Sequence, residues 1–446
     1  MGGAAGSRTP SSASGGIGGP SAADAAAASG GAGGGSGTAS PSNDGGPSDG
    51  AVDRLQGGDV INTADLATDG GGAKSPLGAN DVSYLFPLPS VAAEIDALLA
   101  VDPKMVGPRF LTEAMMTTLL KEGGFTVQNT ANELRGLFRV VALRLDPCAG
   151  VTVVTNPAAC RSEVRLVAQP LALENRTVQA RDFAFHLLFQ VSRAELDDLL
   201  RSLLALKALG QSLAGVALAP HPIMVREGLK GEFVKGVNAL IVKHLAPSKL
   251  VKVALMTVGP TGDGTIWDFA QFVFQNGALV PKSIAGFVAD NGHIVQVSVN
   301  SREDGRTNVI EKGRQYGLPT PDPKIGFPMA LVDSDQATAL STDALKVGLQ
   351  RLRIIEDPAQ SSVDRVDCGS CHFGMQASTY YQKLLGTAVA ATFVAPAGQN
   401  VEQSVPANGN GRNIRAFGYL DSQPVISQRV INESARVADW LSNGVR

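Results

Sequence analysis

The stretch Leu137-Phe138-Arg139-Val140-Val141-Ala142-Leu143-Arg144-Leu145 is rich in β-branched residues, and its apolar and charged side chains partly alternate. Alternation with a period of two is typical of a strand that has one face against a core. Residues 163–171 and 183–191 repeat the pattern. The three runs therefore predict β-strands that lie close together in the fold.

Strand patterns return further along the chain, in residues 250–258, 265–274, 292–299 and 414–419. Between them lie amphipathic stretches that begin at polar capping residues, such as Ser90, Ser192 and Ser341, or carry acidic residues in the first turn. The predicted helices cover residues 90–99, 110–120, 193–206, 229–244, 342–355, 377–385 and 432–441, the last capped by Asn432. The expected fold class is α+β, with mixed helices and antiparallel strands.

Composition divides the chain into three parts. Residues 1–84 are dominated by Gly, Ser and Ala and predict a disordered tether, because such a segment buries too little apolar surface to offset its ordering entropy. Order is expected to begin near Pro87. Residues 85–340 then form an α+β body, and residues 341–446 form a C-terminal region packed on that body.

The C-terminal region contains the segment Cys368-Gly369-Ser370-Cys371-His372. Two thiols three residues apart, followed at once by an imidazole, have the spacing by which c-type haem is attached. The chain has only 4 Cys and 5 His in 446 residues, so a chance arrangement is improbable. The motif predicts one covalent haem c on Cys368 and Cys371, with His372 as the proximal iron ligand. We expect it in a loop after the helix that Pro358 ends.

Three other interpretations of the motif remain open. The two thiols can form a disulfide or a redox-active dithiol, although such pairs usually start a helix that follows a strand. They can bind zinc with His372, in which case a fourth ligand must come from elsewhere. The motif can also be a relic that no longer carries haem.

The second axial position of the iron separates electron transfer from ligand chemistry. No Met follows Met375 and no His follows His372, so a second ligand must lie upstream, or the iron is five-coordinate. The upstream candidates are His186, His221, His244, His293 and Met329. We favour His221, which two prolines hold rigidly, His293 at a strand entry, and Met329. Four aromatic residues, Trp267, Phe269, Phe272 and Phe274, are expected to pack rather than to contact a cofactor.

The remaining cysteines, Cys148 and Cys160, flank a short loop between the first two predicted strands. A disulfide there would pin a hairpin and would place the protein in an oxidising compartment. The alternative is two unpaired thiols in a cytosolic protein. Covalent haem attachment also takes place outside the bacterial cytoplasm, so the two cysteine pairs agree. We therefore expect the periplasm or the outer cell envelope.

The net charge and the hydropathy of the chain limit the kinds of binding partner that we expect. The formal net charge is -3, which gives no electrostatic reason to expect nucleic acid or an anionic membrane surface as a partner. No apolar run reaches the roughly 18 residues of a membrane span. The segment after Met1 has no signal-peptide pattern, so we expect an export signal, and with it a possible lipid anchor, before residue 1.

The chain shows no nucleophile elbow, phosphate loop, zinc-protease motif or second haem motif. Our first interpretation is therefore a haem protein for electron transfer or redox sensing at the cell envelope, with a redox partner, rather than an enzyme. The second is a non-catalytic envelope protein that binds a partner and whose thiols are structural or bind metal. The third is an enzyme with five-coordinate haem.

Several short segments together resemble a group of exported myxobacterial proteins, most of them predicted lipoproteins, with a single c-type haem motif. These segments are Leu-Asp-Pro-Cys at 145–148 with Cys160, Asp-Cys-x-x-Cys-His at 367–372, Arg-Ala-Phe-Gly-Tyr at 415–419, and Ser-Gln-Arg-x-x-Asn-Glu at 427–433. The resemblance extends from about Pro87 to the C-terminus. It implies export and one haem, and it implies no activity.

Overall fold

We describe the protein from a computed structural model. The structure describes residues 76–102, 110–122, 137–207, 211–258, 266–282, 287–288, 296–301, 307–310, 320–321, 334–362, 368–387, 389–405 and 416–444. The predictions for the tether up to residue 75, for His293 and for Met329 lie outside these residues. Residues 71–446 belong to one compact unit.

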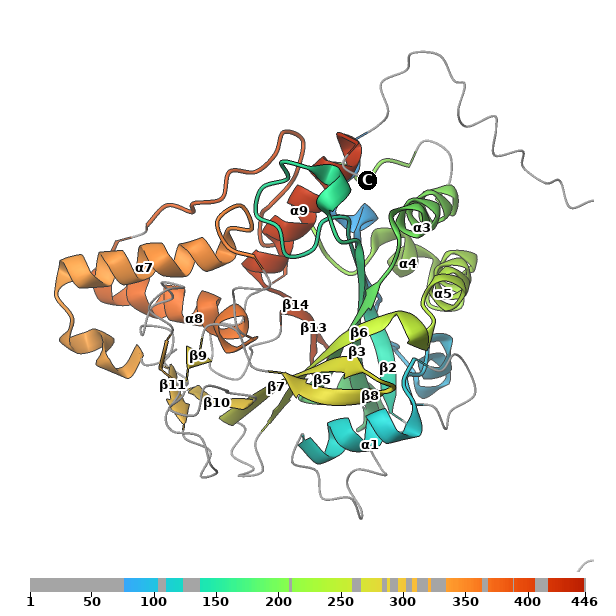
Figure 1. Cartoon of the computed structure of the whole chain (residues 1–446), viewed down its shortest axis with the longest axis horizontal. Coiled ribbons are helices and arrows are strands. Elements are labelled where there is room, and N and C mark those ends of the chain that lie inside the picture. Colours follow the sequence, from blue (N-terminus) through green and yellow to red (C-terminus); the bar gives the residue numbers. More distant parts are fainter. Residues whose placement is uncertain are drawn as a thin grey trace, which may run out of the picture. The chain divides into compact units, whose positions relative to one another are not determined.

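An antiparallel sheet forms the centre of this unit, with strand order β1-β2-β3-β5-β6-β7-β10-β11 (Figure 1). β4 pairs with β3, and β8 pairs with β7. The strands are β1 (Ser83–Leu85), β2 (Phe138–Asp146), β3 (Glu163–Glu174), β4 (Thr177–Ala180), β5 (Phe183–Gln190), β6 (Leu250–Val258), β7 (Ile266–Gln275), β8 (Ala278–Lys282), β10 (Gln296–Ser301) and β11 (Thr307–Ile310). Two small sheets pair β9 (Phe287–Val288) with β12 (Thr320–Pro321), and β13 (Phe417–Leu420) with β14 (Gln423–Ile426). The prediction of mixed helices and antiparallel strands is confirmed.

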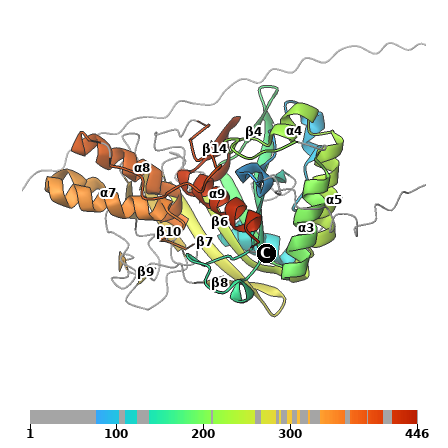
Figure 2. The ribbon, with the colours of Figure 1, turned by 90° about the horizontal axis from the view of Figure 1, so that it is seen from above.

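One face of the sheet is covered by helices α3 (Arg193–Ala205), α4 (Pro222–Glu227) and α5 (Glu232–His244), with α1 (Glu113–Glu122) against β8 (Figures 1 and 2). Side chains alternate along a strand, so β5 sends Phe185, Leu187 and Phe189 into this core. Ser192 starts α3 with a capping box: its Oγ accepts the N–H of Glu195, whose carboxylate accepts the N–H of Ser192.

Helices α7 (Thr342–Glu356) and α8 (Cys368–Leu385) pack side by side and share a small core of their own (Figures 1 and 2). Ser341 caps α7 as predicted, because its Oγ accepts the N–H of Ala344. The two helices approach closely where Gly348 meets the ring of Tyr381. A Cβ at position 348 would lie 2.6 Å from Tyr381 Cε1, which is too close for any side chain.

Three predicted boundaries are wrong. The chain is ordered before Pro87: the 3-10 turn Ala79–Asp81 and strand β1 are buried, and Tyr84 is fully covered. Residues 92–97 form a 3-10 helix rather than an α-helix, although Ser90 does bind Glu94. The terminal helix α9 (Gln428–Ser442) is capped by Ser427 rather than Asn432, because Ser427 Oγ accepts the N–H of Val430.

Candidate functional site

The haem motif lies at the start of helix α8, which begins at Cys368. The prediction that the motif sits in a loop, with a helix only from residue 377, is therefore wrong. Packing explains the helix, because Phe373 and Ala377 are buried in the turns that follow the motif. The side chains of Cys371 and His372 are both half-buried. The helix thus presents the second thiol and the imidazole from adjacent positions.

Cys371 and His372 line a partly open cavity of about 210 Å³. The opposite wall is the face of the sheet that does not carry α3 and α5. The cavity is completed by Ala416 and Phe417 at the start of β13, and by Arg429, Val430 and Glu433 of α9. Cys371 and His372 therefore face the centre of the sheet rather than a loop at its edge.

His186 lies on the cavity wall opposite the motif. It alternates along β5 with the core residues Phe185 and Leu187, so its ring points to the other face of the sheet. The ring centroids of His186 and His372 are 6.1 Å apart, and the rings are tilted by 59°. The neighbours of His186 across β3 and β6 are Val167 and Ala254, which are short and apolar.

Two further residues near His372 were not expected at the site. Phe269 of β7 is buried, as expected of a packing residue, and its ring contacts that of His372 at a centroid distance of 5.2 Å. Met256 of β6 stands opposite Phe269 in the sheet and also lines the cavity. His186, Met256 and Phe269 each alternate along a strand with residues of the main core, and this alternation is the sequence signal that could have located them.

The cavity carries an excess of positive charge. Among the described residues that line it, six are cationic and two are carboxylates. The cations are Arg144, Arg161, Arg165, Lys252, Lys282 and Arg429, and the carboxylates are Glu163 and Glu433. An excess of fixed cations around a partly buried space favours an anionic ligand, such as one that carries carboxylate groups.

These surroundings also keep the imidazole on β5 neutral. Burial lowers the pKa of His186 well below its usual range, and Arg165, His372 and Arg144 lower it further. A neutral imidazole has a lone pair on one ring nitrogen and can therefore bind a metal.

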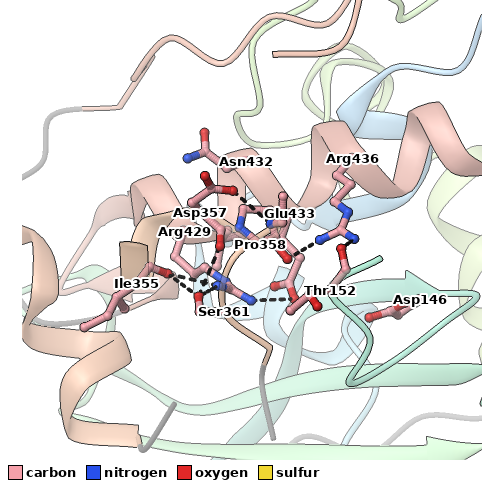
Figure 3. A network of polar contacts seen from close by, with 12 residues as sticks. Asp146, Thr152, Ile355, Asp357, Pro358, Ser361, Arg429, Asn432, Glu433 and Arg436 are labelled. Carbon is pink, nitrogen blue, oxygen red and sulfur yellow. Dashed lines mark hydrogen bonds and ion pairs between the residues drawn. The ribbon is translucent and has the colours of Figure 1, made fainter. Parts of the chain in front are cut away.

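Helix α9 binds the segment before the motif through a buried polar network (Figure 3). Arg429 donates to the carbonyl of Ile355 at 2.9 Å and to Ser361 Oγ at 2.5 Å. Asn432 donates to the carbonyl of Glu356 at 2.8 Å. These bonds fix residues 355–361, the end of α7 and the turn that follows it.

The same helix reaches the hairpin loop that contains the disulfide. Arg436 donates to the carbonyls of Pro358 and Thr152 (Figure 3). Its guanidinium lies 4.0 Å from the centroid of the Trp440 ring. Cys148 and Cys160 are joined by a disulfide across this loop, as the sequence predicted. One helix therefore holds both segments beside the cavity.

The other predicted ligands lie elsewhere. His221 is fully buried and stacks between the rings of Tyr84 and Phe233, at centroid distances of 4.8 and 4.9 Å. It is not among the residues that line the cavity with His372. His244 ends α5 and lies 3.4 Å from Asp198. The structure thus brings His186 to His372, and it does not bring His221 or His244 there.

The groups around His372 fit a haem. Among the side chains that the structure describes, no three of His, Cys, Asp and Glu gather closely enough to hold a metal ion by themselves. A haem iron would need only axial ligands from the protein, and imidazoles such as those of His186 and His372 can serve as such ligands. The surrounding cations suit the carboxylates of the haem propionates.

No protein-family model matches the chain, and neither does any curated protein or any solved structure. Within the described ranges, no helix is both long enough and apolar enough to cross a membrane.

Proposed function

We propose that the protein is an exported, monohaem, c-type cytochrome-like protein that serves electron transfer or redox sensing at the cell envelope. One haem is held covalently by Cys368 and Cys371, and His372 is its proximal ligand. When bound, the haem supplies a one-electron Fe(III)/Fe(II) couple.

The observation that carries the proposal is the position of Cys371 and His372 on the wall of a cavity, with a second imidazole opposite. A structural thiol pair needs no adjacent space, whereas a thioether-linked macrocycle must lie next to its motif. Here the space is present, and its wall supplies a nitrogen donor from His186 and several cations. Phe269 adds an aromatic surface beside His372.

The placement of the other short segments supports the same site. Arg429, Val430 and Glu433 from 427–433 and Ala416 and Phe417 from 415–419 line the cavity. Asp146 of the Leu-Asp-Pro-Cys segment lies next to Glu433 in the same network. Three of the four segments that carry the resemblance to exported myxobacterial proteins thus contribute to the lining of one cavity. The Cys148–Cys160 disulfide suits an oxidising compartment such as the periplasm.

The test is expression of the full chain behind a periplasmic export signal, together with the c-type maturation machinery, followed by a haem-stained denaturing gel. Wild type and Cys148→Ala are expected to stain, and Cys371→Ala and Cys368→Ala are expected to lose the stain. The Cys148→Ala control removes a cysteine outside the motif. Folded wild type that does not stain, or whose motif binds zinc instead, would refute the proposal.

A further inference from the structure

We propose that His186 is the second axial ligand, so that the iron is six-coordinate with two histidines. The inference rests on the proposed haem at Cys368, Cys371 and His372. It assigns the iron one ligand from the middle of the sheet and one from the motif on α8. It also separates electron transfer from a five-coordinate haem enzyme, because the sixth position would already be filled.

The distance between the two rings agrees with this role. A metal–imidazole bond is about 2.0–2.1 Å long, and the centre of the ring lies about 1 Å beyond the nitrogen, so two imidazoles on opposite sides of one ion have centroids about 6 Å apart. The centroids of His186 and His372 are 6.1 Å apart.

The position of His186 on the sheet also suits a ligand. β5 is paired along both edges, with β3 and with β6, so the backbone at His186 is held firmly. Its two direct cross-strand neighbours, Val167 and Ala254, have short apolar side chains. A ligand on a rigid element that lines the same cavity as His372 is held ready for its metal.

Met256 is the competing candidate. It lines the cavity and lies on β6 two residues beyond Ala254, the direct neighbour of His186. Its partner across the sheet is Phe269, so the ring of Phe269 stands beside it. His186 is favoured over Met256 because its imidazole centroid lies 6.1 Å from that of His372, which is the separation expected of two imidazoles on one ion.

Optical spectra of the matured full-length protein test this role, with His186→Ala, His186→Met and His244→Ala compared with wild type. Wild type and the His244→Ala control are expected to be low-spin in both oxidation states, and the reduced proteins are expected not to bind carbon monoxide. His186→Ala is expected to keep its covalent haem, to become high-spin and to bind carbon monoxide. Added imidazole is expected to restore the low-spin spectrum, which it would not do if His186 had only a structural role.

His186→Met provides a conservative variant. It is expected to stay six-coordinate, with a methionine-to-iron band and a higher reduction potential than wild type, because Met ligation raises the potential. The inference is overturned if haem-loaded wild type binds carbon monoxide readily, or if His186→Ala keeps the wild-type spectrum. A methionine signature already present in wild type would assign Met256 instead. Wild type with no covalent haem overturns the proposed function itself, which the haem-stained gel shows independently.

Discussion

The guanidinium of Arg144 on β2 lies 3.0 Å from the carboxylate of Glu433 on α9, and little of either side chain is exposed. Arg429, one turn earlier on α9, lies 3.5 Å from the same carboxylate. Burial alone would raise the pKa of Glu433, but Arg144, Arg429 and Arg165 together lower it to about 2. This carboxylate therefore stays charged at neutral pH and links the helix beside the cavity to the sheet.

Replacing Glu433 by Gln is expected to lower the free energy of unfolding by about 3 kcal/mol, because it leaves buried guanidinium groups without their counter-charge. Chemical denaturation measures this change. The matched control is Glu232→Gln, which breaks the exposed pair with Lys235 and should change stability by less than about 1 kcal/mol. Equal effects of the two substitutions would show that Glu433 has no special structural role.

Asp146 should make stability depend on pH in the neutral range. Burial, and then the negative charge of Glu433, raise the pKa of Asp146 to about 7. Between pH about 4 and pH about 7, Asp146 is therefore protonated in the folded protein and ionised in the unfolded chain. The stability that Asp146 contributes is present at low pH and is lost as the pH rises through 7.

In Asp146→Asn this loss should be absent, so the free energy of unfolding should fall less between pH 5 and pH 8 than it does in wild type. The amide keeps an oxygen in place of Asp146 Oδ1, which accepts the N–H of Cys148 at 2.9 Å. Denaturation curves at the two pH values measure the difference. Parallel changes in both proteins would mean that Asp146 is not protonated in the folded state at pH 5.

His221 is expected to act on stability and not on the haem. Burial, and then the positive charge of Lys207, lower its pKa to about 3. Its contribution to stability is therefore present above the unfolded pKa of about 6.5 and is lost as the pH falls toward 3. In His221→Phe the free energy of unfolding should fall less than in wild type as the pH is lowered from about 6.5 toward 3, and the haem spectrum should stay unchanged. A change in the spectrum would instead support His221 as an iron ligand.

The Cys148–Cys160 disulfide should contribute about 3 kcal/mol to stability on the chain-entropy model, because it closes a short loop in the unfolded chain. Replacing both residues by Ala should lower the melting temperature and leave covalent haem in place. Thermal melts of wild type with and without a reductant measure the same effect. A reductant that leaves the melting temperature unchanged would argue against a structural role for the bond.

The sequence predicted the parts of the fold that depend on local patterns. Alternation located β2, β3 and β5, and the caps Ser192 and Ser341 start α3 and α7 as expected. The helix through the haem motif was missed. Its first residues include Gly369 and Ser370, which have low helix propensity, and the helix is supported by packing that only the tertiary structure shows.

The motif itself was predictable from spacing, but its partners were not. His221 was favoured as an iron ligand because it lies between Pro220 and Pro222. Its ring is enclosed by Tyr84 and Phe233 instead. His186 precedes the motif by about 180 residues, and only the order of the strands and the docking of α8 bring the two together. Strand β1 was missed because it is three residues long and follows a segment rich in glycine.

The intact mass of the matured, purified protein tests the central claim most directly. We predict that wild type has the mass of the polypeptide plus one haem, and that the Cys368→Ala/Cys371→Ala double variant has the mass of the polypeptide alone. Folded wild type with the mass of the bare polypeptide, from cells that attach haem to a control cytochrome, would contradict the account.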